Sequence, residues 1–162
     1  MSRPIIFADA EFPGLSPNGT HLLSLALIKE SGEELYIEFD YRGKTNAWVK
    51  KHVLPSLSGK KVSQVKAKKL IRAFVGKQEP YFLSYVNAFD WMAILKLFGV
   101  HKHPFYWIPL DLASLFYARG INVRGGLDGV ARRLGIKMQQ FTRHNALDDA
   151  RLVKMVYEKL MV

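Results

Sequence analysis

The sequence predicts a mixed α/β fold in which helices flank one five-stranded sheet. Three observations support this prediction. Apolar runs separated by short turns occupy the N-terminal part, apolar residues recur with helical spacing from Asn46 onward, and two further apolar strands lie between the helical segments. Strands joined by short turns pair antiparallel, whereas a connection through a helix joins parallel strands. We therefore expect an antiparallel meander of strands 1 to 3, followed by parallel strands, with helices on the sheet faces.

The expected strands are short apolar runs bounded by turn-forming residues. The segment PGLSPNGT follows the first strand, and KESGE separates the second strand from the third. The five predicted strands cover residues 4–10, 21–28, 34–41, 81–86 and 105–112.

Six segments show the spacing of helices. Gly99 is expected to end the third helix, because glycine readily adopts the backbone conformation that closes a helix. The predicted helices cover residues 46–54, 63–75, 88–99, 112–120, 127–135 and 146–160. The second helix is expected to turn its lysines outward. The residues predicted to face inward from it are Val65, Leu70, Ala73 and Phe74.

Composition narrows the class of protein. The chain has 162 residues and is 49% hydrophobic, enough to bury a sizeable core, and it predicts a single domain spanning residues 1–162. No apolar run approaches the ~20 residues of a membrane-spanning helix, and the N-terminus lacks the layout of a signal peptide. The absence of cysteine excludes disulfides and thiolate metal sites and fits a reducing compartment. We therefore expect a cytoplasmic protein that does not contact membranes.

The charge is strongly positive but unevenly distributed. The formal net charge of +10, from 24 Lys and Arg against 14 Asp and Glu, attracts polyanions such as nucleic acid, although a basic solvated surface is also common. Basic residues crowd into KKVSQVKAKK, ARRLGIK and TRH. Several acids instead fall in apolar segments, which suits a site that holds metal cations and receives a phosphate backbone. These acids are Asp9, Glu11, Asp90, Asp148 and Asp149.

Asp9 and Glu11 end the first predicted strand with Ala10 between them. Residues two apart in a strand face the same side, so the two carboxylates project together. Carboxylates this close repel, and either one takes a proton or a cation sits between them. The alternative is that both lie in a loop and are solvated.

In the last predicted helix, Asp149 shares a face with Val153 and Val156, so it is expected to point inward. Asp148 lies nearer the boundary, where a first-turn acid near Arg151 favours the helix dipole. The sequence thus assigns Asp149 to chemistry and Asp148 to structure.

Four other polar residues lie at or near predicted helix starts. His144 is expected on the loop entering the last helix, where it is either exposed or, beside a buried acid, a proton acceptor near neutral pH. Asn145 is a possible cap of that helix. Asp90 lies in the first turn of an apolar helix, where it either favours the dipole or joins the other acids. Asp111 resembles an N-cap.

The order of DAE, NAFD and HNALDDA along the chain resembles the three exonuclease motifs of the DEDDh (DnaQ-like) 3′–5′ exonucleases. That superfamily includes the proofreading subunit of bacterial DNA polymerase III, ribonuclease T and oligoribonuclease. The resemblance implies a ribonuclease H-like fold with the first strand central. It also implies that two divalent cations are held by Asp9, Glu11, Asp90 and Asp149, with His144 as the general base. All-oxygen ligands indicate Mg²⁺ or Mn²⁺.

A narrower similarity links EFDYRGKTNAWVKKHVLP and YVNAFDWMAI to the single-domain exoribonucleases typified by mycobacterial ribonuclease AS. It implies an RNA substrate. Within the first of these stretches, we expect Trp48 in the core and His52 on a helix surface. Three positions depart from the superfamily pattern. Ala10 replaces a frequent Thr, Val86 stands where His is common, and an acid often found early in the second strand is absent around His21.

Together these features predict a metal-dependent 3′–5′ exoribonuclease that removes 5′-mononucleotides from single-stranded RNA by two-metal hydrolysis. Asp9 would bridge both ions, Glu11 and Asp149 would help hold the ion that binds the nucleophilic water, and Asp90 would support the other. The alternatives are a 3′–5′ DNA exonuclease of the repair or proofreading type, and a non-catalytic nucleic-acid-binding module with the same fold. A homodimer is expected by analogy with ribonuclease T and oligoribonuclease.

The substrate-binding residues are predicted from their places beside the acids. Phe12 and Leu15 would stack on or wedge between the terminal nucleotides, and Arg143 would contact phosphate. Trp91 is assigned to the core because its helix is apolar on most sides.

Overall fold

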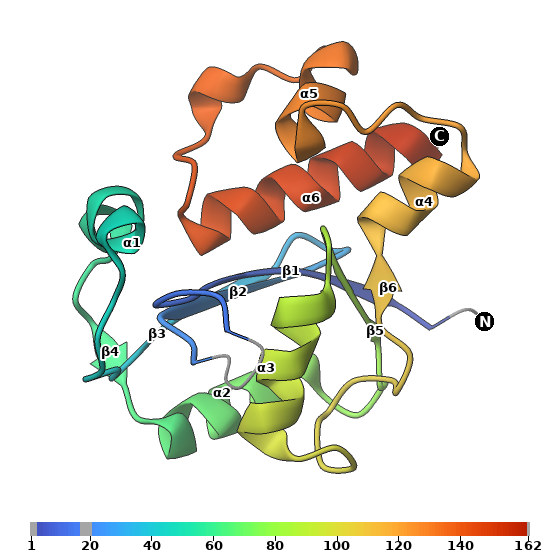
Figure 1. Cartoon of the computed structure of the whole chain (residues 1–162). Helices are drawn as coiled ribbons and strands as arrows, with labels where there is room; N and C mark the ends of the chain where they lie inside the picture. Colours follow the sequence, from blue (N-terminus) through green and yellow to red (C-terminus); the bar gives the residue numbers. More distant parts are fainter. Residues whose placement is uncertain (1–2, 17–20, 162) are drawn as a thin grey trace.

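A computed structural model describes residues 3–16 and 21–161 of the chain, which form a mixed sheet with helices on both faces (Figure 1). The sheet has six strands in the order β4-β3-β2-β1-β5-β6. β1 pairs antiparallel with β2, and β2 with β3, whereas β5 runs parallel to β1 and to β6. The strands are β1 (Ile5–Glu11), β2 (Ser24–Lys29), β3 (Glu34–Phe39), β4 (Lys61–Val62), β5 (Tyr81–Ser84) and β6 (Leu110–Asp111).

The predicted fold class is confirmed, with β1 central and the meander in place, and the sheet has one strand more than predicted. The added strand, β4, is two residues long and pairs parallel with the end of β3. A pair of residues carries no periodicity, so the sequence offers no sign of it. Residues 17–20 of the predicted turn PGLSPNGT lie outside the described residues.

The predicted helices all form, with small shifts at their ends. Gly99 closes α3 with a φ of 93°, and the Asp111 side chain caps α4 by accepting the N–H of Ser114, as predicted. Within the described part of the chain, no helix combines the length and apolarity needed to cross a membrane. The helices are α1 (Ala47–His52), α2 (Gln64–Val75), α3 (Ala88–Phe98), α4 (Leu112–Ala118), α5 (Gly126–Arg133) and α6 (Ala146–Met161), and short 3₁₀ turns cover Leu54–Ser56 and Met138–Gln140.

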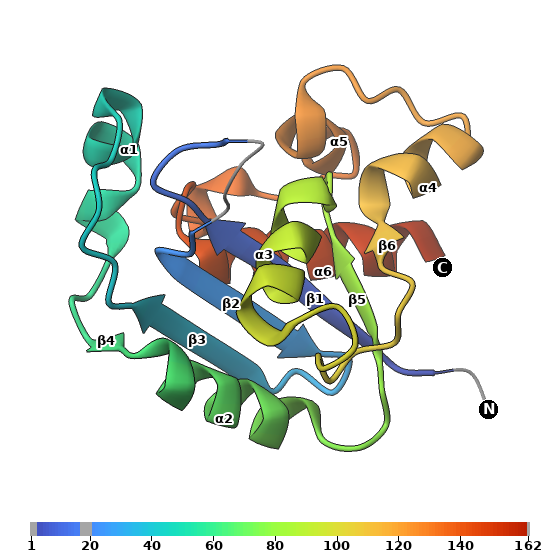
Figure 2. The same ribbon diagram turned by 60° about the horizontal axis from the view of Figure 1, so that its bottom comes forward.

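The sheet separates two hydrophobic cores. α2 and α3 cover one face, and α4, α5 and α6 cover the other (Figures 1 and 2). Along β1, Ile6 and Ala8 pack toward α2 and α3, whereas Ile5 and Phe7 pack toward α6. Alternation along the strand therefore turns Asp9 and Glu11 toward the α6 face.

The predicted inward face of α2 is wrong. The helix buries Ala67, Ile71 and Val75, which are spaced four residues apart, while Val65 is 67% exposed and Leu70 37% exposed. Ala73 is also exposed and Phe74 is partly buried. Apolar residues surround more than half of this helix, so periodicity alone selects no single stripe. Contact with the sheet selects the stripe that contains the small side chain of Ala67.

Two substitutions on α2 test this face. Ile71→Ala removes a fully buried side chain and should lower the free energy of unfolding by about 2–5 kcal/mol. Leu70→Ala, the matched control one residue away, should cost less than about 1 kcal/mol because Leu70 is partly in water already. Urea denaturation measures both values, and an equal or reversed order would contradict the observed face.

Candidate active site

Chemically active side chains converge on a cleft at the carboxyl end of β1. The cleft has a volume of about 430 Å³ and lies between β1, α5 and the start of α6. Tyr85 and the glycine pair Gly125 and Gly126 form part of its wall. Its charged and titratable lining residues are Asp9, Asp128, Arg132, Arg143, His144 and Asp149.

Three of the predicted site residues lie together at this cleft, two in its lining and one, Glu11, buried behind them. Ligand atoms of Glu11, His144 and Asp149 all lie within 4.8 Å of one another, although they come from opposite ends of the chain. Glu11 and Asp149 are buried, at 9% and 5% exposure. Two carboxylates and an imidazole at this spacing are donors suited to a divalent cation.

Asp9 and Asp90 belong to the same electrostatic cluster. Burial raises the pKa of Asp9 well above its usual range, and the charges of Asp90 and Glu11 raise it further. Burial raises the pKa of Glu11 to about 7, against the opposing effect of Arg143. The structure thus brings together all four predicted carboxylates.

Asp90 reaches the cluster from the first turn of α3. Burial raises its pKa to about 7, although the Ser84 hydroxyl and the backbone N–H of Ala10 donate to its carboxylate. The Ser84 Oγ to Asp90 Oδ2 distance is 2.9 Å. Between β5 and α3, Val86 has a φ of 55°, an unusual conformation for a β-branched residue. This tight turn brings the start of α3 back toward the end of β1.

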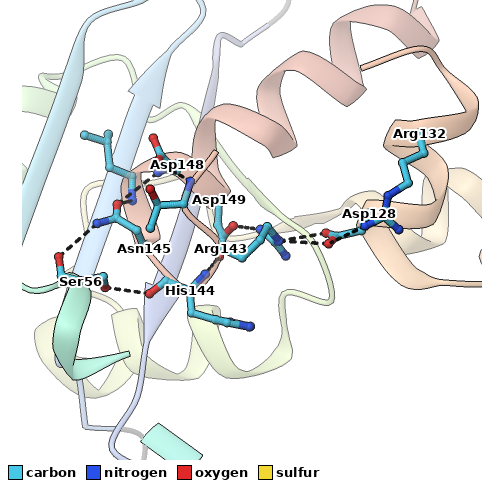
Figure 3. A network of polar contacts seen from close by, with 10 residues as sticks. Ser56, Asp128, Arg132, Arg143, His144, Asn145, Asp148 and Asp149 are labelled. Atoms are coloured by element: carbon cyan, nitrogen blue, oxygen red, sulfur yellow. Dashed lines mark hydrogen bonds and ion pairs between the residues drawn. The ribbon is translucent and has the colours of Figure 1, made fainter. Parts of the chain in front are cut away.

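Asp149 points inward from the first turn of α6 and accepts the backbone N–H of His144 at 3.0 Å (Figure 3). His144 lies on the loop before the helix, as predicted, and its φ of 61° is left-handed. Asn145 caps the helix, its side-chain oxygen accepting the N–H groups of Leu147 and Asp148 at 3.1 and 3.3 Å. The buried carboxylate and the cap together hold the backbone at His144 in this conformation.

The structural assignment of Asp148 is also confirmed. Its carboxylate accepts the N–H of Thr142 at 2.8 Å and pairs with Arg151 at 2.8 Å. Arg151 also pairs with Glu34 at 2.6 Å, which ties the start of α6 to β3. These contacts occupy Asp148 outside the cleft.

Ser56 is a site-supporting residue that sequence reasoning missed. Its hydroxyl lies 3.0 Å from the carbonyl oxygen of His144, and its own carbonyl accepts the Asn145 side chain at 3.3 Å (Figure 3). Buried Glu38 holds the adjoining segment by accepting the N–H groups of Ser58 and Gly59 at 2.5 and 2.8 Å. Ser56 and His144 are 88 residues apart, and no local pattern signals such a contact.

Trp48 corrects another prediction. The sequence placed it in the core, but it is 49% exposed, and its ring centroid lies 4.7 Å from that of His144. α1 buries only Val49, which leaves the neighbouring position on the helix outside the core. His52 is exposed, as predicted, and its ring lies 4.9 Å from Trp48. An aromatic surface therefore borders His144.

The remaining candidates differ in burial. Phe12 is partly buried against the core beneath α2 and α3, whereas Leu15 is 64% exposed. Trp91 packs on Phe82, with ring centroids 5.6 Å apart, which confirms its assignment to the core. Arg143 lies inside the cleft, where it pairs with Asp149 and with Asp128.

The arrangement of strands and helices is a ribonuclease H-like fold similar to that of exonuclease I. One solved structure of exonuclease I aligns with a TM-score of 0.78 and 17% identity over 98% of this chain and 41% of that chain. E. coli exonuclease I in complex with a dA16 oligonucleotide aligns with a TM-score of 0.75 and 19% identity over 99% of this chain and 41% of that chain. This chain thus spans less than half of the proteins it matches.

A third structure, the zinc-bound complex of E. coli exonuclease I with single-stranded DNA, aligns with a TM-score of 0.75 and 16% identity over 99% of this chain and 40% of that chain. No protein-family model and no curated protein matches the sequence. At these identities the similarity establishes the fold.

The raised pKa values predict how stability depends on pH without metal. In the folded protein, Glu11 and Asp90 keep their protons to about pH 7, whereas in the unfolded chain they ionise near pH ~4. Between these values the folded state binds more protons, so these groups make the free energy of unfolding decrease as pH rises. Glu11→Gln removes one such group. The free energy of unfolding of Glu11→Gln, minus that of the unsubstituted protein, should therefore increase as the pH rises from about 4 to about 7.

Thermal denaturation in a chelating buffer, at a series of pH values, measures this difference. Glu33→Gln is the control, because Glu33 is an exposed acid whose pKa is lowered by Lys29. Its relative stability should not increase over the same window. A difference between Glu11→Gln and the unsubstituted protein that is independent of pH would contradict the pKa assigned to Glu11.

Proposed function

We propose that this chain is a metal-dependent 3′–5′ exonuclease domain, spanning residues 1–162, that acts on single-stranded DNA. The observation that carries the proposal is the convergence of four carboxylates and His144 at one cleft of a strongly basic protein: Asp9, His144 and Asp149 line the cleft, and buried Glu11 and Asp90 lie behind it. A polyanion-binding module gains nothing from buried acids at its ligand site, whereas a phosphodiesterase uses them to hold cations beside the scissile phosphate.

The choice of DNA departs from the RNA preference predicted from sequence. The structural matches include exonuclease I in complex with dT13 and dA16 oligonucleotides, and no comparison supports the narrower resemblance to ribonuclease AS. The predicted homodimer remains a prediction.

We propose that two divalent cations, Mg²⁺ or Mn²⁺, are held by Asp9, Glu11, Asp90 and Asp149, and the close approach of Glu11, His144 and Asp149 supports a cation at this position. Bound there, they would activate water and neutralise charge on the attacking and leaving oxygens. Glu11 and Asp90 carry protons near neutral pH, and a divalent cation must displace these protons to bind. The affinity for the cation should therefore increase as the pH rises.

His144 has the chemistry of the proton acceptor. Burial lowers its pKa, and the charges of Arg143 and His52 lower it further, so the imidazole is neutral at pH 7. Ser56 and Asp149 hold its backbone from two sides, which directs the side chain toward the carboxylates. A neutral, oriented imidazole can take the proton from the attacking water.

Exposed apolar groups near the cleft would position the terminal bases. Trp48 presents its ring beside His144, and Leu15 follows the β1 carboxylates along the chain. Aromatic faces bind bases of single strands with little sequence preference. Phe12 would add a partly buried apolar side chain to this surface. Arg143 would place a positive charge close to a phosphate of the bound strand.

The substrate test uses 5′-labelled single-stranded DNA and RNA of equal length with Mn²⁺. We expect stepwise shortening of DNA from the 3′ end, and loss of activity in Asp149→Ala. Asp148→Asn is the matched control on the same helix turn and should remain active, because Asp148 is engaged outside the cleft. Preferential shortening of RNA would restore the exoribonuclease prediction, and binding without shortening would indicate a non-catalytic module.

His144→Ala separates a general base from a metal ligand. Loss of a general base should reduce the turnover rate by ~10²–10⁴-fold while leaving Mn²⁺ binding intact. Because His144 lies within 4.8 Å of two carboxylates, direct ligation is the competing role, and it predicts weaker Mn²⁺ binding as well. Single-turnover kinetics and calorimetric titration with Mn²⁺ give the two readouts. An unchanged rate would exclude both roles.

A further inference from the structure

Arg143 places a cation inside the carboxylate cluster. Its guanidinium pairs with Asp149 through Nη1, and neither atom of that pair contacts solvent. On the other side, its Nε lies 3.0 Å from Oδ1 of Asp128 (Figure 3). The side chain therefore bridges α5 and α6 across the cleft, with one end on a predicted metal ligand.

The charge of Arg143 also acts on the β1 carboxylates. It opposes the upward shift in the pKa of both Asp9 and Glu11, so it lies close enough to stabilise their ionised forms. Arg132 lines the same cleft but is 64% exposed and contacts only the outer acid, Asp128, at 3.9 Å. The two arginines differ in that Arg143 alone of this pair reaches Asp149.

The contacts of Arg143 and the requirements of a cation site compete. A carboxylate oxygen already paired with a guanidinium in a solvent-free contact cannot coordinate a cation closely without losing that partner. The positive charge of Arg143 also repels an entering divalent cation. If the pair breaks, the buried carboxylate of Asp149 is left without a partner unless another cation takes the place of Arg143.

We propose that Arg143 is an internal counter-ion that neutralises Asp149 in the metal-free protein and must leave it when a divalent cation binds. This inference rests on the metal site of the proposed function. It explains how a cluster of buried acids tolerates the absence of metal. Asp128 would keep the Nε end of the side chain in the cleft, so Arg143 stays near the site after it leaves Asp149.

The test measures Mn²⁺ binding without nucleic acid. Arg143→Met keeps an unbranched side chain but removes the charge, and it should bind Mn²⁺ about 5–150-fold more tightly, the range of a typical coupling between two binding events. Arg132→Met, the matched control, removes the same charge from the same cleft without touching Asp149. Its affinity should change much less than that of Arg143→Met. Titration followed by electron paramagnetic resonance of free Mn²⁺ gives each affinity.

A second readout reports on folding. Metal-free Arg143→Met should have a lower melting temperature than the unsubstituted protein, because Asp149 loses its partner, and saturating Mn²⁺ should remove most of that difference. Equal or weaker Mn²⁺ binding by Arg143→Met would overturn the proposal, as would the same gain in Arg132→Met. If binding tightens as expected but no variant shortens DNA or RNA, the counter-ion role stands and the nuclease function fails.

Discussion

Mutual repulsion among buried carboxylates is the constraint on which the site depends. Burial raises the pKa values of Asp9 and Glu11 from β1 and of Asp90 from α3, and neighbouring carboxylates raise those of Asp9 and Asp90 further. Asp149, from α6, is paired with Arg143. Protons and one guanidinium thus offset the repulsion. In the proposed function, divalent cations would replace both. The rest of the fold holds the four carboxylates in place against a force that would separate them.

Rigid elements supply that restraint. β1 lies in the middle of the sheet, paired with β5 from Ile5 to Phe7 and with β2 as far as Glu11, so β2 holds its carboxyl end. The loop before α6 is held from within by Asp149 and Asn145, and from outside by Ser56. A left-handed residue such as His144 persists only where its surroundings enforce that backbone, and hydrogen bonds on both sides do so here.

The resemblance of fold and the chemistry of the cleft support the proposed activity in different ways. The fold is shared with exonuclease I across nearly all of this chain, yet a fold by itself hosts many activities. The cleft adds acidic residues, an imidazole of lowered pKa and an exposed aromatic surface at Trp48. Substrate choice depends on contacts with the sugar and base, which neither the motifs nor the fold specifies.

The sequence alone determined the features that follow from the chemistry of neighbouring residues and from the regular spacing of apolar residues in strands and helices. Alternation placed Asp9 and Glu11 on one side of β1, the turn of α6 separated Asp149 from Asp148, and Asp111 and Gly99 marked helix ends. Tertiary structure decided which stripe of α2 is buried, the exposure of Trp48, the pairing of β4, and the contacts of Ser56 and Arg143. These depend on segments far apart in the chain, whose mutual approach is set by packing of the whole core and leaves no periodic trace in either segment.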